Sequence, residues 1–371
     1  MAVQKLSIEE FLQLSKQYPV FDVRSPGEFN QAHIIGAISL PLFTDEERKI
    51  VGTAYKQESK QKAIKIGLDY FGVKMRVLVE EVEALFVGPN ILPKKLPFTN
   101  DQQSTKTILL HCWRGGMRSA GVAWLLDLYG FKVYTLIGGY KAYRKWVLTQ
   151  FEKDYTFKII GGYTGSGKTL VIDELTKQQK VINLEGLAHH KGSAFGALGQ
   201  EPQPTQEMFE NLLGQKLADV SGALAEIDTS QPTNDKRQAC IWLEDESQRI
   251  GNLQIPMPLW YTLRKSAVYF LEIPFEERLN YLTEEYGKFT KEQLVNAVIR
   301  IQKRLGGLET KNAINLLLEN NHKESFRILL NYYDKWYIKG LNNRENIEHL
   351  LNKIPCEGVD TKINTKKILE C

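Results

Sequence analysis

Cysteine is scarce in this chain of 371 residues, and long apolar runs are missing from it. The four cysteines lie far apart and in no metal-ligand spacing, so we expect neither a disulfide framework nor a zinc site. They are Cys112, Cys240, Cys356 and Cys371. No run of about 18 apolar residues occurs, and the first residues lack the apolar core of a signal peptide. The sequence therefore predicts a cytoplasmic protein without a membrane partner.

Charge and composition are both ordinary. The net charge is +4, hydrophobic residues make up 43% of the chain and charged residues 25%, as in common soluble globular proteins. No internal repeat or low-complexity tract stands out, and the length suits two or three domains. A mildly basic chain suits a polyanionic ligand, but many proteins without such a ligand share this charge. Charge alone therefore selects no function.

Strands and helices alternate through residues 1–150. Apolar strand-like runs occur at 20–23 and 105–112, a Lys-rich helical stretch lies at 55–67, and a helix and another strand follow the second run. Such alternation predicts a parallel α/β sheet, in which sites lie at the carboxyl ends of strands. Cys112 falls at such an end.

A second α/β domain is predicted for residues 151–285. The stretch "FKIIGGYTGSGKTLVIDELTK" has the pattern of strand, glycine loop and helix, and three further strand-like runs follow it. Residues 286–352 have helical periodicity, with a capping box formed by Thr290 and Gln293. Residues 353–371 form a tail that we expect to be too polar and too short to join a core.

The loop "HCWRGGMRS" has the composition of an anion-binding site. A reactive cysteine must be a thiolate, which loop N–H groups, a helix N-terminus and nearby arginines stabilise. Glycines let the backbone wrap closely around an anion. We therefore predict Cys112, Arg114 and Arg118 as catalytic residues, although a lone cysteine without this context is more commonly a small buried hydrophobe.

A second anion site is predicted between a strand and a helix, where the sequence has the pattern of a phosphate-binding loop. In such a loop glycine N–H groups wrap phosphate oxygens, the lysine reaches them and the hydroxyl can bind Mg²⁺. We expect it to bind a diphosphate or triphosphate group, and we predict no tightly bound cofactor. The residues concerned are Gly162, Gly165, Ser166, Gly167, Lys168 and Thr169.

Acidic residues follow two of the predicted strands. Glu244, Asp245 and Glu246 end the strand "CIWLEDES", a common place for a residue that meets a metal ion or its water. Glu185 precedes two adjacent histidines, of which at most one can face a site from a helix. The sequence does not choose among Glu244, Asp245 and Glu246, and a capping or salt-bridging cluster explains them equally well. For the segment with Glu185 and the histidines, the alternative is a solvated, basic surface loop. The metal requirement stays open.

Two stretches of the first domain resemble the rhodanese domain. "FDVRSPGEFNQAHIIGAISLP" resembles its opening signature and "HCWRGGMRS" its active-site loop, which implies a cysteine that carries sulfur or selenium. Arg118 follows Cys112 by six residues instead of the usual five, a spacing that rhodanese-fold phosphatases share. Transferase and phosphatase chemistry therefore both stay open at this point. Asp22, Arg24 and His33 are interpreted as structural residues that fix turns.

Over about residues 5–350 the chain resembles the bacterial tRNA 2-selenouridine synthase family. The fusion of the two domains carries this resemblance, together with "DEERKIVGTAYKQ", "EGLAHHKGSAFG", "QPTQEMFEN" and "WLEDESQRIG". It implies a transferase that replaces sulfur by selenium in 2-thiouridine at the tRNA wobble position. Selenophosphate would be the donor, and an S-geranyl intermediate would be made from geranyl diphosphate. Asn183 stands where the family is expected to have aspartate, which weakens the case for a metal ligand there.

The resemblance also implies roles for the two loops. Lys168 and loop N–H groups would meet the departing diphosphate, and Cys112 would hold or deliver selenium. Arg114 and Arg118 would bind the selenophosphate, which a separate selenophosphate-supplying enzyme would provide.

The helical part is the candidate surface for tRNA. Its cations could meet phosphates and its aromatic rings could stack on an extruded base, although such residues at helical spacing are also common in cores and on solvated faces. They are Lys303, Arg304, Arg327, Tyr332, Tyr333, Lys335 and Trp336. Two other function classes remain: a nucleotide-dependent kinase or rhodanese-fold phosphatase, and a catalytically silent sulfur carrier or RNA-binding module.

Overall fold

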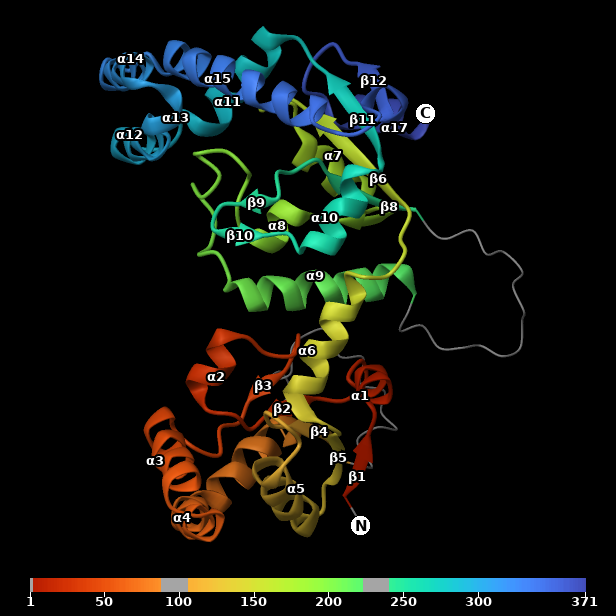
Figure 1. Cartoon of the computed structure of the whole chain (residues 1–371), viewed down its shortest axis with the longest axis vertical. Coiled ribbons are helices and arrows are strands. Elements are labelled where there is room, and N and C mark those ends of the chain that lie inside the picture. The colour runs from red at the N-terminus through yellow and green to blue at the C-terminus, as the bar shows by residue number, and fades with distance from the viewer. Residues whose placement is uncertain (1–2, 88–105, 223–239) are drawn as a thin grey trace, which may run out of the picture. The chain divides into compact units, whose positions relative to one another are not determined.

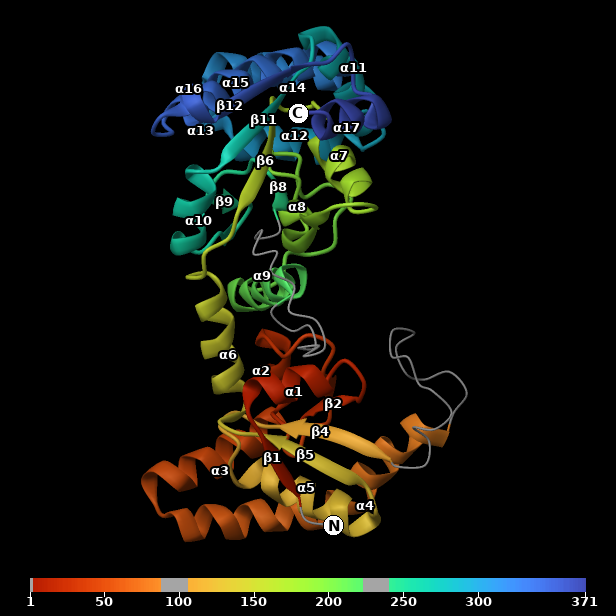
Figure 2. The ribbon, with the colours of Figure 1, turned by 90° about the vertical axis from the view of Figure 1, so that its right-hand side faces the viewer.

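The chain forms two compact units, which divide between Gln150 and Phe151 in this computed structural model. The structure describes residues 3–87, 106–222 and 240–371. Each unit is built on a five-stranded parallel sheet with helices packed around it (Figures 1 and 2). This architecture confirms the predicted fold class, two successive α/β domains with a helical part near the C-terminus.

The first unit has the strand order β1-β5-β4-β2-β3. Its strands are β1 (Gln4–Leu6), β2 (Val20–Asp22), β3 (Ile38–Ser39), β4 (Thr107–His111) and β5 (Lys132–Leu136). Its helices are α1 (Ile8–Leu14), α2 (Pro26–Gln31), α3 (Asp45–Gln57), α4 (Lys60–Val87), α5 (Met117–Tyr129) and α6 (Gly139–Gln150). Every residue of β4 is buried, as expected of a central parallel strand covered on both faces.

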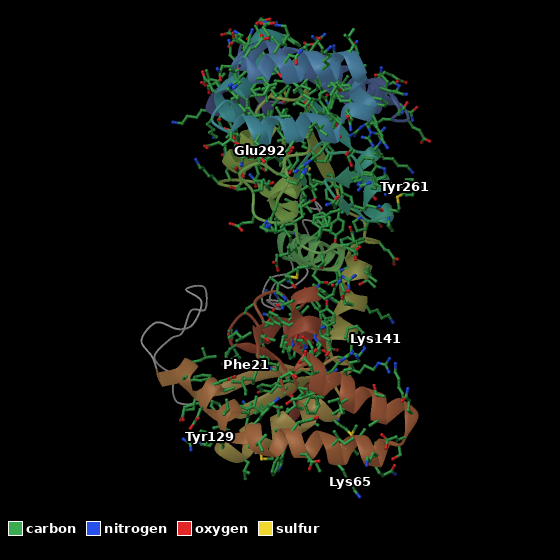
Figure 3. The ribbon with its side chains drawn as sticks, turned by 90° about the vertical axis from the view of Figure 1, so that its left-hand side faces the viewer. Phe21, Lys65, Tyr129, Lys141, Tyr261 and Glu292 are labelled. Atoms are coloured by element: carbon green, nitrogen blue, oxygen red, sulfur yellow. The ribbon has the colours of Figure 1, made fainter. Side chains whose placement is uncertain are left out.

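Apolar side chains from one face of this sheet pack with those of α4 and α5 in a core of the first unit. Phe21 of β2 is one of them, and its side chain lies within the unit in Figure 3. The Lys-rich stretch at 55–67, expected to be one helical segment, instead contains the junction of α3 and α4. Ser59 breaks the helix there because its side chain accepts a hydrogen bond from the Lys62 amide, 3.1 Å away, which starts a new helix.

The second unit has the strand order β12-β11-β6-β8-β7. Its sheet strands are β6 (Phe157–Gly162), β7 (Lys180–Ile182), β8 (Ile241–Glu244), β11 (Ala267–Glu272) and β12 (Leu351–Pro355), and a small antiparallel pair is β9 (Arg249–Ile250) with β10 (Leu253–Gln254). The helices that precede the helical part are α7 (Lys168–Leu175), α8 (Leu184–Ala188), α9 (Gln206–Ser221), α10 (Met257–Arg264) and α11 (Phe275–Tyr286). Because β6 pairs directly with β8, the phosphate loop and the acidic strand end share one edge of the sheet.

Helices gather near one end of the second unit's sheet, as Figure 1 shows in blue. They are α12 (Lys291–Arg300), α13 (Gln302–Leu305), α14 (Gly307–Leu318), α15 (His322–Asn342) and the short α16 (Ile347–Leu350). The predicted capping box is present, since Thr290 and Gln293 each accept a hydrogen bond from the other's backbone. Leu294, Phe326 and Leu330 belong to the apolar core that α11 and this helical part share.

The expectation that residues 353–371 take no part in a core is wrong. Strand β12 extends the sheet by pairing in parallel with β11, and α17 (Thr361–Leu369) packs against α7. Ile354, Cys356 and Ile368 are buried in the core of the sheet. Few apolar residues suffice here because an edge strand and a short helix each need only one buried face.

None of the helices in the described residues is both long and apolar enough to span a membrane.

Candidate active sites

The cysteine loop joins the end of β4 to the start of α5. Cys112 directly follows the strand and is only 3% exposed, while Trp113 and Arg114 next to it are exposed. Arg118 lies in the first turn of α5. The structure thus places Cys112 and Arg114 on the loop and Arg118 at the start of the next helix, and only the thiol is buried.

Glycines in this loop are required by close backbone contacts. Gly115 has a φ of +63°, and a Cβ there would lie 2.7 Å from the Leu136 carbonyl oxygen. Gly139, at the start of α6, also has positive φ, and a Cβ there would collide with the Cys112 carbonyl. The Tyr140 amide donates to that same carbonyl at 2.8 Å. The N-terminus of α6 therefore packs directly on the cysteine loop and fixes its path.

Arg118 is held by an acidic residue from α2. Its guanidinium donates to the Glu28 carboxylate at 2.7 and 3.5 Å, and the Nε of Arg48 lies 3.6 Å from the same group. Burial alone would raise the pKa of Glu28, but the hydrogen bond and charge of Arg118 hold that pKa below its ordinary value. Glu28 is therefore an anion, and it binds Arg118, the arginine that the sequence assigned to an anionic ligand.

The thiol of Cys112 has a hydroxyl as its close partner. Ser119 Oγ lies 3.1 Å from Cys112 Sγ and can also donate to the Gly116 carbonyl oxygen at 3.1 Å. A hydroxyl has one proton, so it either donates to Gly116 and accepts from the thiol, or it turns and donates to a thiolate. Ser119 can thus serve both protonation states of the sulfur.

Asp22, Arg24 and His33 have the structural positions predicted for them. The Arg24 guanidinium is buried, donates to Asp22 and to the Ala32 carbonyl, and stacks 3.8 Å from the Tyr140 ring centroid. His33 bonds the Phe29 carbonyl and stacks on the Phe29 ring. These contacts hold α2 and α6 against β2, and so support the cysteine loop that packs on α6.

The phosphate loop adopts the backbone that its glycines allow. Gly162, Gly165 and Gly167 all have positive φ. A Cβ on Gly165 would lie 2.9 Å from Leu282 of α11, and a Cβ on Gly167 would lie 2.6 Å from Val359 after β12. The glycine pattern therefore reflects both a phosphate-wrapping backbone and close packing against later parts of the chain.

Within this loop, Lys168 and Thr169 already have protein partners. The Lys168 ammonium donates to the Gly162 carbonyl oxygen at 3.0 Å, and the Thr169 hydroxyl donates to Glu185 at 2.5 Å. Ser166 is 1% exposed and its hydroxyl has no partner among the described residues. Cation, hydroxyls and glycine backbone thus lie together on one short segment, where an anion would find its donors.

Three of the four predicted acidic residues gather beside Lys168 and Thr169. Glu244, only 2% exposed, accepts from the Glu185 amide at 2.7 Å through one oxygen, and its other oxygen has no partner among the described residues. Burial, and then the charge of Glu185, raises the pKa of Glu244 to about 8. The same two causes raise the pKa of Glu246. Glu244 therefore carries a proton at neutral pH.

Asp245 lies apart from this cluster. Its carboxylate accepts from the Tyr337 hydroxyl at 2.7 Å and is paired with the buried Arg344. Successive residues at a strand end point to opposite sides, so Glu244 and Glu246 can share a site that Asp245 does not. Asn183, where an aspartate was expected, instead caps α8 by accepting from the Gly186 amide.

Of the two adjacent histidines, only His190 lies near the acidic cluster. It is largely buried, which lowers its pKa, and its Nδ1 accepts from the Gly192 amide at 3.2 Å. His189 turns away and contacts the Pro202 carbonyl. The two side chains diverge because His189 has a left-handed backbone with φ of 50°.

The structure divides the candidate tRNA residues into packed and exposed ones. Arg327 is bound by Glu276 and Glu324, and the Tyr333 hydroxyl accepts from the Ala194 amide at 2.7 Å. Tyr332 packs partly against the helical core. Exposed side chains remain on Lys303, Arg304, Lys335 and Trp336, the last being 49% exposed.

Sequence reasoning missed the residues that reach the phosphate loop from α11 and α15. Arg278 donates to the Thr164 carbonyl at 3.0 Å and is paired with Asp334. The Tyr337 hydroxyl accepts from the Gly162 amide at 3.0 Å. A faint signal was available: Gly161, which the phosphate-loop pattern does not require, is needed because a Cβ there would lie 3.0 Å from that hydroxyl.

A thiol at one strand end and a glycine-wrapped lysine at another define a protein that joins a rhodanese-like domain to a P-loop domain. Residues 7–145 match the family described as the rhodanese-like domain. Residues 155–353 match the family described as the tRNA 2-selenouridine synthase AAA domain. The chain belongs to the tRNA 2-selenouridine synthase family, which confirms the resemblance found in its motifs.

Full-length relatives agree with this assignment. The tRNA 2-selenouridine synthase of Sulfurovum sp. (strain NBC37-1) is 33% identical over 86% of this chain and 87% of its own length. That of Hydrogenovibrio crunogenus is 32% identical over 87% of this chain and 89% of its own length. One solved structure is the N-terminal domain of a putative ATP/GTP binding protein from Clostridium difficile 630. It is 37% identical to this chain, and the match covers 40% of this chain and 99% of that domain, with a TM-score of 0.33.

Proposed function

We propose that this protein is a tRNA-modifying transferase that replaces sulfur by selenium in 2-thiouridine at the tRNA wobble position. Geranyl diphosphate would first alkylate the sulfur, and selenophosphate, supplied by a separate enzyme, would then provide selenium. The observation that carries this proposal is the presence, on one chain of this family, of a buried thiol loop and a lysine-bearing phosphate loop.

The two loops make chemical sense as consecutive steps. Sulfide is a poor group to expel from a thiocarbonyl carbon, whereas S-alkylation turns that carbon into an activated electrophile and the sulfur into a thiolate leaving group. Alkylation therefore prepares the base for selenium. A chain that performs both steps needs one site for a departing diphosphate and another for a chalcogen.

The phosphate loop is assigned to the departing diphosphate. Lys168 and the loop N–H groups would meet negative charge as the bond from carbon to oxygen breaks, which is how a fixed cation accelerates such a step. In the unliganded loop the Lys168 ammonium lies on the Gly162 carbonyl, and a diphosphate would take over that contact.

Mg²⁺ is the metal that this loop would suit. Hard oxygen donors are present in the Thr169 hydroxyl, the Glu185 carboxylate and the unpartnered oxygen of Glu244. No group of three or more acidic, histidine or cysteine residues in the described ranges is arranged to hold a metal by itself. This fits an ion that keeps several waters and binds phosphate oxygens, and that would neutralise part of the diphosphate charge.

The cysteine loop is assigned to selenium. Selenium stays at the selenide level in this step: water attacks the phosphorus of selenophosphate, phosphate is released, and selenide bonds to the activated base carbon as the geranyl thiolate leaves. Cys112, as its thiolate, would deliver the selenide to that carbon, with the Ser119 hydroxyl turned to donate to the thiolate. Arg118 would exchange Glu28 for the anionic donor, and the exposed Arg114 would add a second positive charge. Both arginines thus act on the anion.

The tRNA surface is assigned to exposed residues of the helical part. Trp336 projects from α15 with the Lys339 ammonium 5.1 Å from its ring centroid, a pairing suited to an unstacked base and its phosphate. Lys303 and Lys311 line a shallow surface groove beside α13 and α14, whose other lining residues carry no charge. These cations would contact the tRNA backbone.

Nucleoside analysis tests the proposal. Thiolated tRNA is incubated with the protein, geranyl diphosphate and selenophosphate, and the digested nucleosides are measured by mass spectrometry. The expected products are S-geranyl-2-thiouridine without selenophosphate and 2-selenouridine with it. ATP consumption without change in the uridine would instead favour a kinase or phosphatase, and tRNA retention without chemistry would favour a binding module.

A further inference from the structure

Helix α15 reaches the phosphate loop through a tyrosine that sequence motifs do not mark. The Tyr337 hydroxyl accepts from the Gly162 amide at 3.0 Å and donates to the Asp245 carboxylate at 2.7 Å. Asp245 is paired in turn with Arg344, which is buried. The hydrogen bonds therefore run in one direction, from the loop amide through the hydroxyl to a fixed ion pair.

This chain of hydrogen bonds acts on the first glycine of the loop. The peptide before Gly162 is held by Tyr337, and the peptide after it is held by Lys168, whose ammonium donates to the Gly162 carbonyl at 3.0 Å. Gly162 has a φ of 153°, a conformation that other residues rarely adopt. In the unliganded loop, side chains of Tyr337 and Lys168 therefore fix the two peptides that flank Gly162.

The tyrosine can be only a neutral partner. Burial, and then the charge of Asp245, raises its pKa well above the ordinary value for tyrosine. The hydroxyl consequently keeps its proton and donates it to Asp245, which leaves its oxygen free to accept from Gly162. Phenylalanine would fill the same space but could do neither.

Resting on the proposed function, we infer that Tyr337, oriented by Asp245 and Arg344, is a positioning residue of the diphosphate site. It holds the phosphate loop in its binding conformation before the ligand arrives, so the ligand does not have to order it. The tyrosine acts through the Gly162 amide and need not touch the diphosphate. Helix α15 would thus contribute a residue to the diphosphate site as well as apolar side chains to the helical core.

The test compares two variants on the same helix in the full-length chain. Tyr337→Phe removes the hydroxyl at the loop. Ser325→Ala removes another fully buried hydroxyl of α15, which donates to the Ala313 carbonyl at 2.9 Å and has no contact with the loop. Binding of inorganic pyrophosphate with Mg²⁺ is measured by calorimetry, and KM for geranyl diphosphate is measured separately from kcat.

We expect Tyr337→Phe to weaken pyrophosphate binding by about three- to tenfold, the loss typical of one hydrogen bond, and to raise KM for geranyl diphosphate in parallel. Ser325→Ala should stay within about twofold of the unmodified chain. Equal affinity in Tyr337→Phe, or an equal loss in Ser325→Ala, overturns the inference while the proposed function stands. Failure of the unmodified chain to bind pyrophosphate overturns both.

A second variant keeps the inference testable if Tyr337→Phe does not fold. Gly161→Ala retains the tyrosine but places a Cβ 3.0 Å from its hydroxyl and 2.7 Å from a methyl group of Val268. Gly161 has no positive φ, so alanine suits its backbone. We expect Gly161→Ala to push the hydroxyl off Gly162 and weaken pyrophosphate binding as well; unchanged binding in a folded variant contradicts the inference.

Discussion

The cysteine loop and the phosphate loop both follow a parallel strand and open a helix, yet they balance their charges by different means. In the first unit the arginine that would bind an anion is paired with Glu28. In the second unit the lysine lies beside carboxyl groups. Burial raises the pKa of Glu246, and it raises the pKa of Glu244 to about 8, so that Glu244 holds a proton at neutral pH. At the cysteine loop the positive charge of Arg118 is balanced by an ion pair with Glu28. At the phosphate loop the negative charge is reduced because Glu244 is protonated.

This difference predicts how each loop responds to a ligand. An anion at the cysteine loop must displace a carboxylate from Arg118, which is a local exchange of partners. A metal and diphosphate at the phosphate loop must displace protons, so that site depends on pH. Variants can separate the two loops, since each should fail in its own step of the proposed reaction.

The largest effect is expected from Cys112→Ser. Loss of the thiol should reduce formation of 2-selenouridine by about three orders of magnitude or more, while S-geranylated tRNA accumulates because the phosphate loop is intact. Nucleoside mass spectrometry measures both products. Cys371→Ser, which changes an exposed cysteine, is the control. Normal selenium incorporation by Cys112→Ser would remove the thiol from the mechanism.

Lys168→Ala should give the opposite pattern. Without its ammonium the departing diphosphate loses a fixed cation, and the geranylation rate should fall by about a hundred- to a thousandfold. Selenium transfer to tRNA that has been geranylated beforehand should continue. Lys177→Ala, just beyond the same helix and mostly exposed, should leave the rate unchanged. If both lysine variants geranylate normally, the loop has another role.

Glu28→Gln sharpens the comparison at the cysteine loop. Removing the carboxylate charge frees Arg118, so inorganic phosphate, a stand-in for selenophosphate, should bind about three- to tenfold more tightly. The measurement is protection of Cys112 from alkylation by iodoacetamide. Glu80→Gln, which breaks an exposed ion pair with Arg76 in the same unit, is the matched control. Weaker protection in Glu28→Gln would mean that Glu28 positions Arg118 and does not compete for it.

The two loops could be predicted from sequence because each is contiguous. Cys112 with its arginines, and Gly162 with Lys168, lie within a few residues of one another, so local spacing contains their chemistry. Their charge partners are distant in sequence: Glu28 lies 90 residues from Arg118, and Tyr337 lies 175 residues from Gly162. Only the packing of α2 beside α5, or of α15 over β6, brings such pairs together.

The acidic residues and the C-terminal tail show a second limit. Glu244, Asp245 and Glu246 had equal claims in the sequence, and the alternation of side chains at the end of β8 separates Asp245 from Glu244. The polar composition after residue 352 suggested a loose tail, because apolar content was judged over the whole segment. An edge strand and a short helix need few buried residues to pack on a core. Ile354 of β12 and Ile368 of α17 are buried there.

The effect that distinguishes the phosphate loop is a dependence of stability on pH. The pKa of Glu244 is about 8 in the folded chain, above the ordinary glutamate value of 4.5. The folded state therefore binds the extra proton, and its stability falls as pH rises from about 5 to about 8. Thermal melting from pH 5 to 9 should show this fall, and Mg²⁺ with pyrophosphate should stabilise the chain more at pH 8.5 than at pH 6. Glu244→Gln, which cannot titrate, should flatten the slope, whereas a slope that persists in this variant would assign the proton to another group.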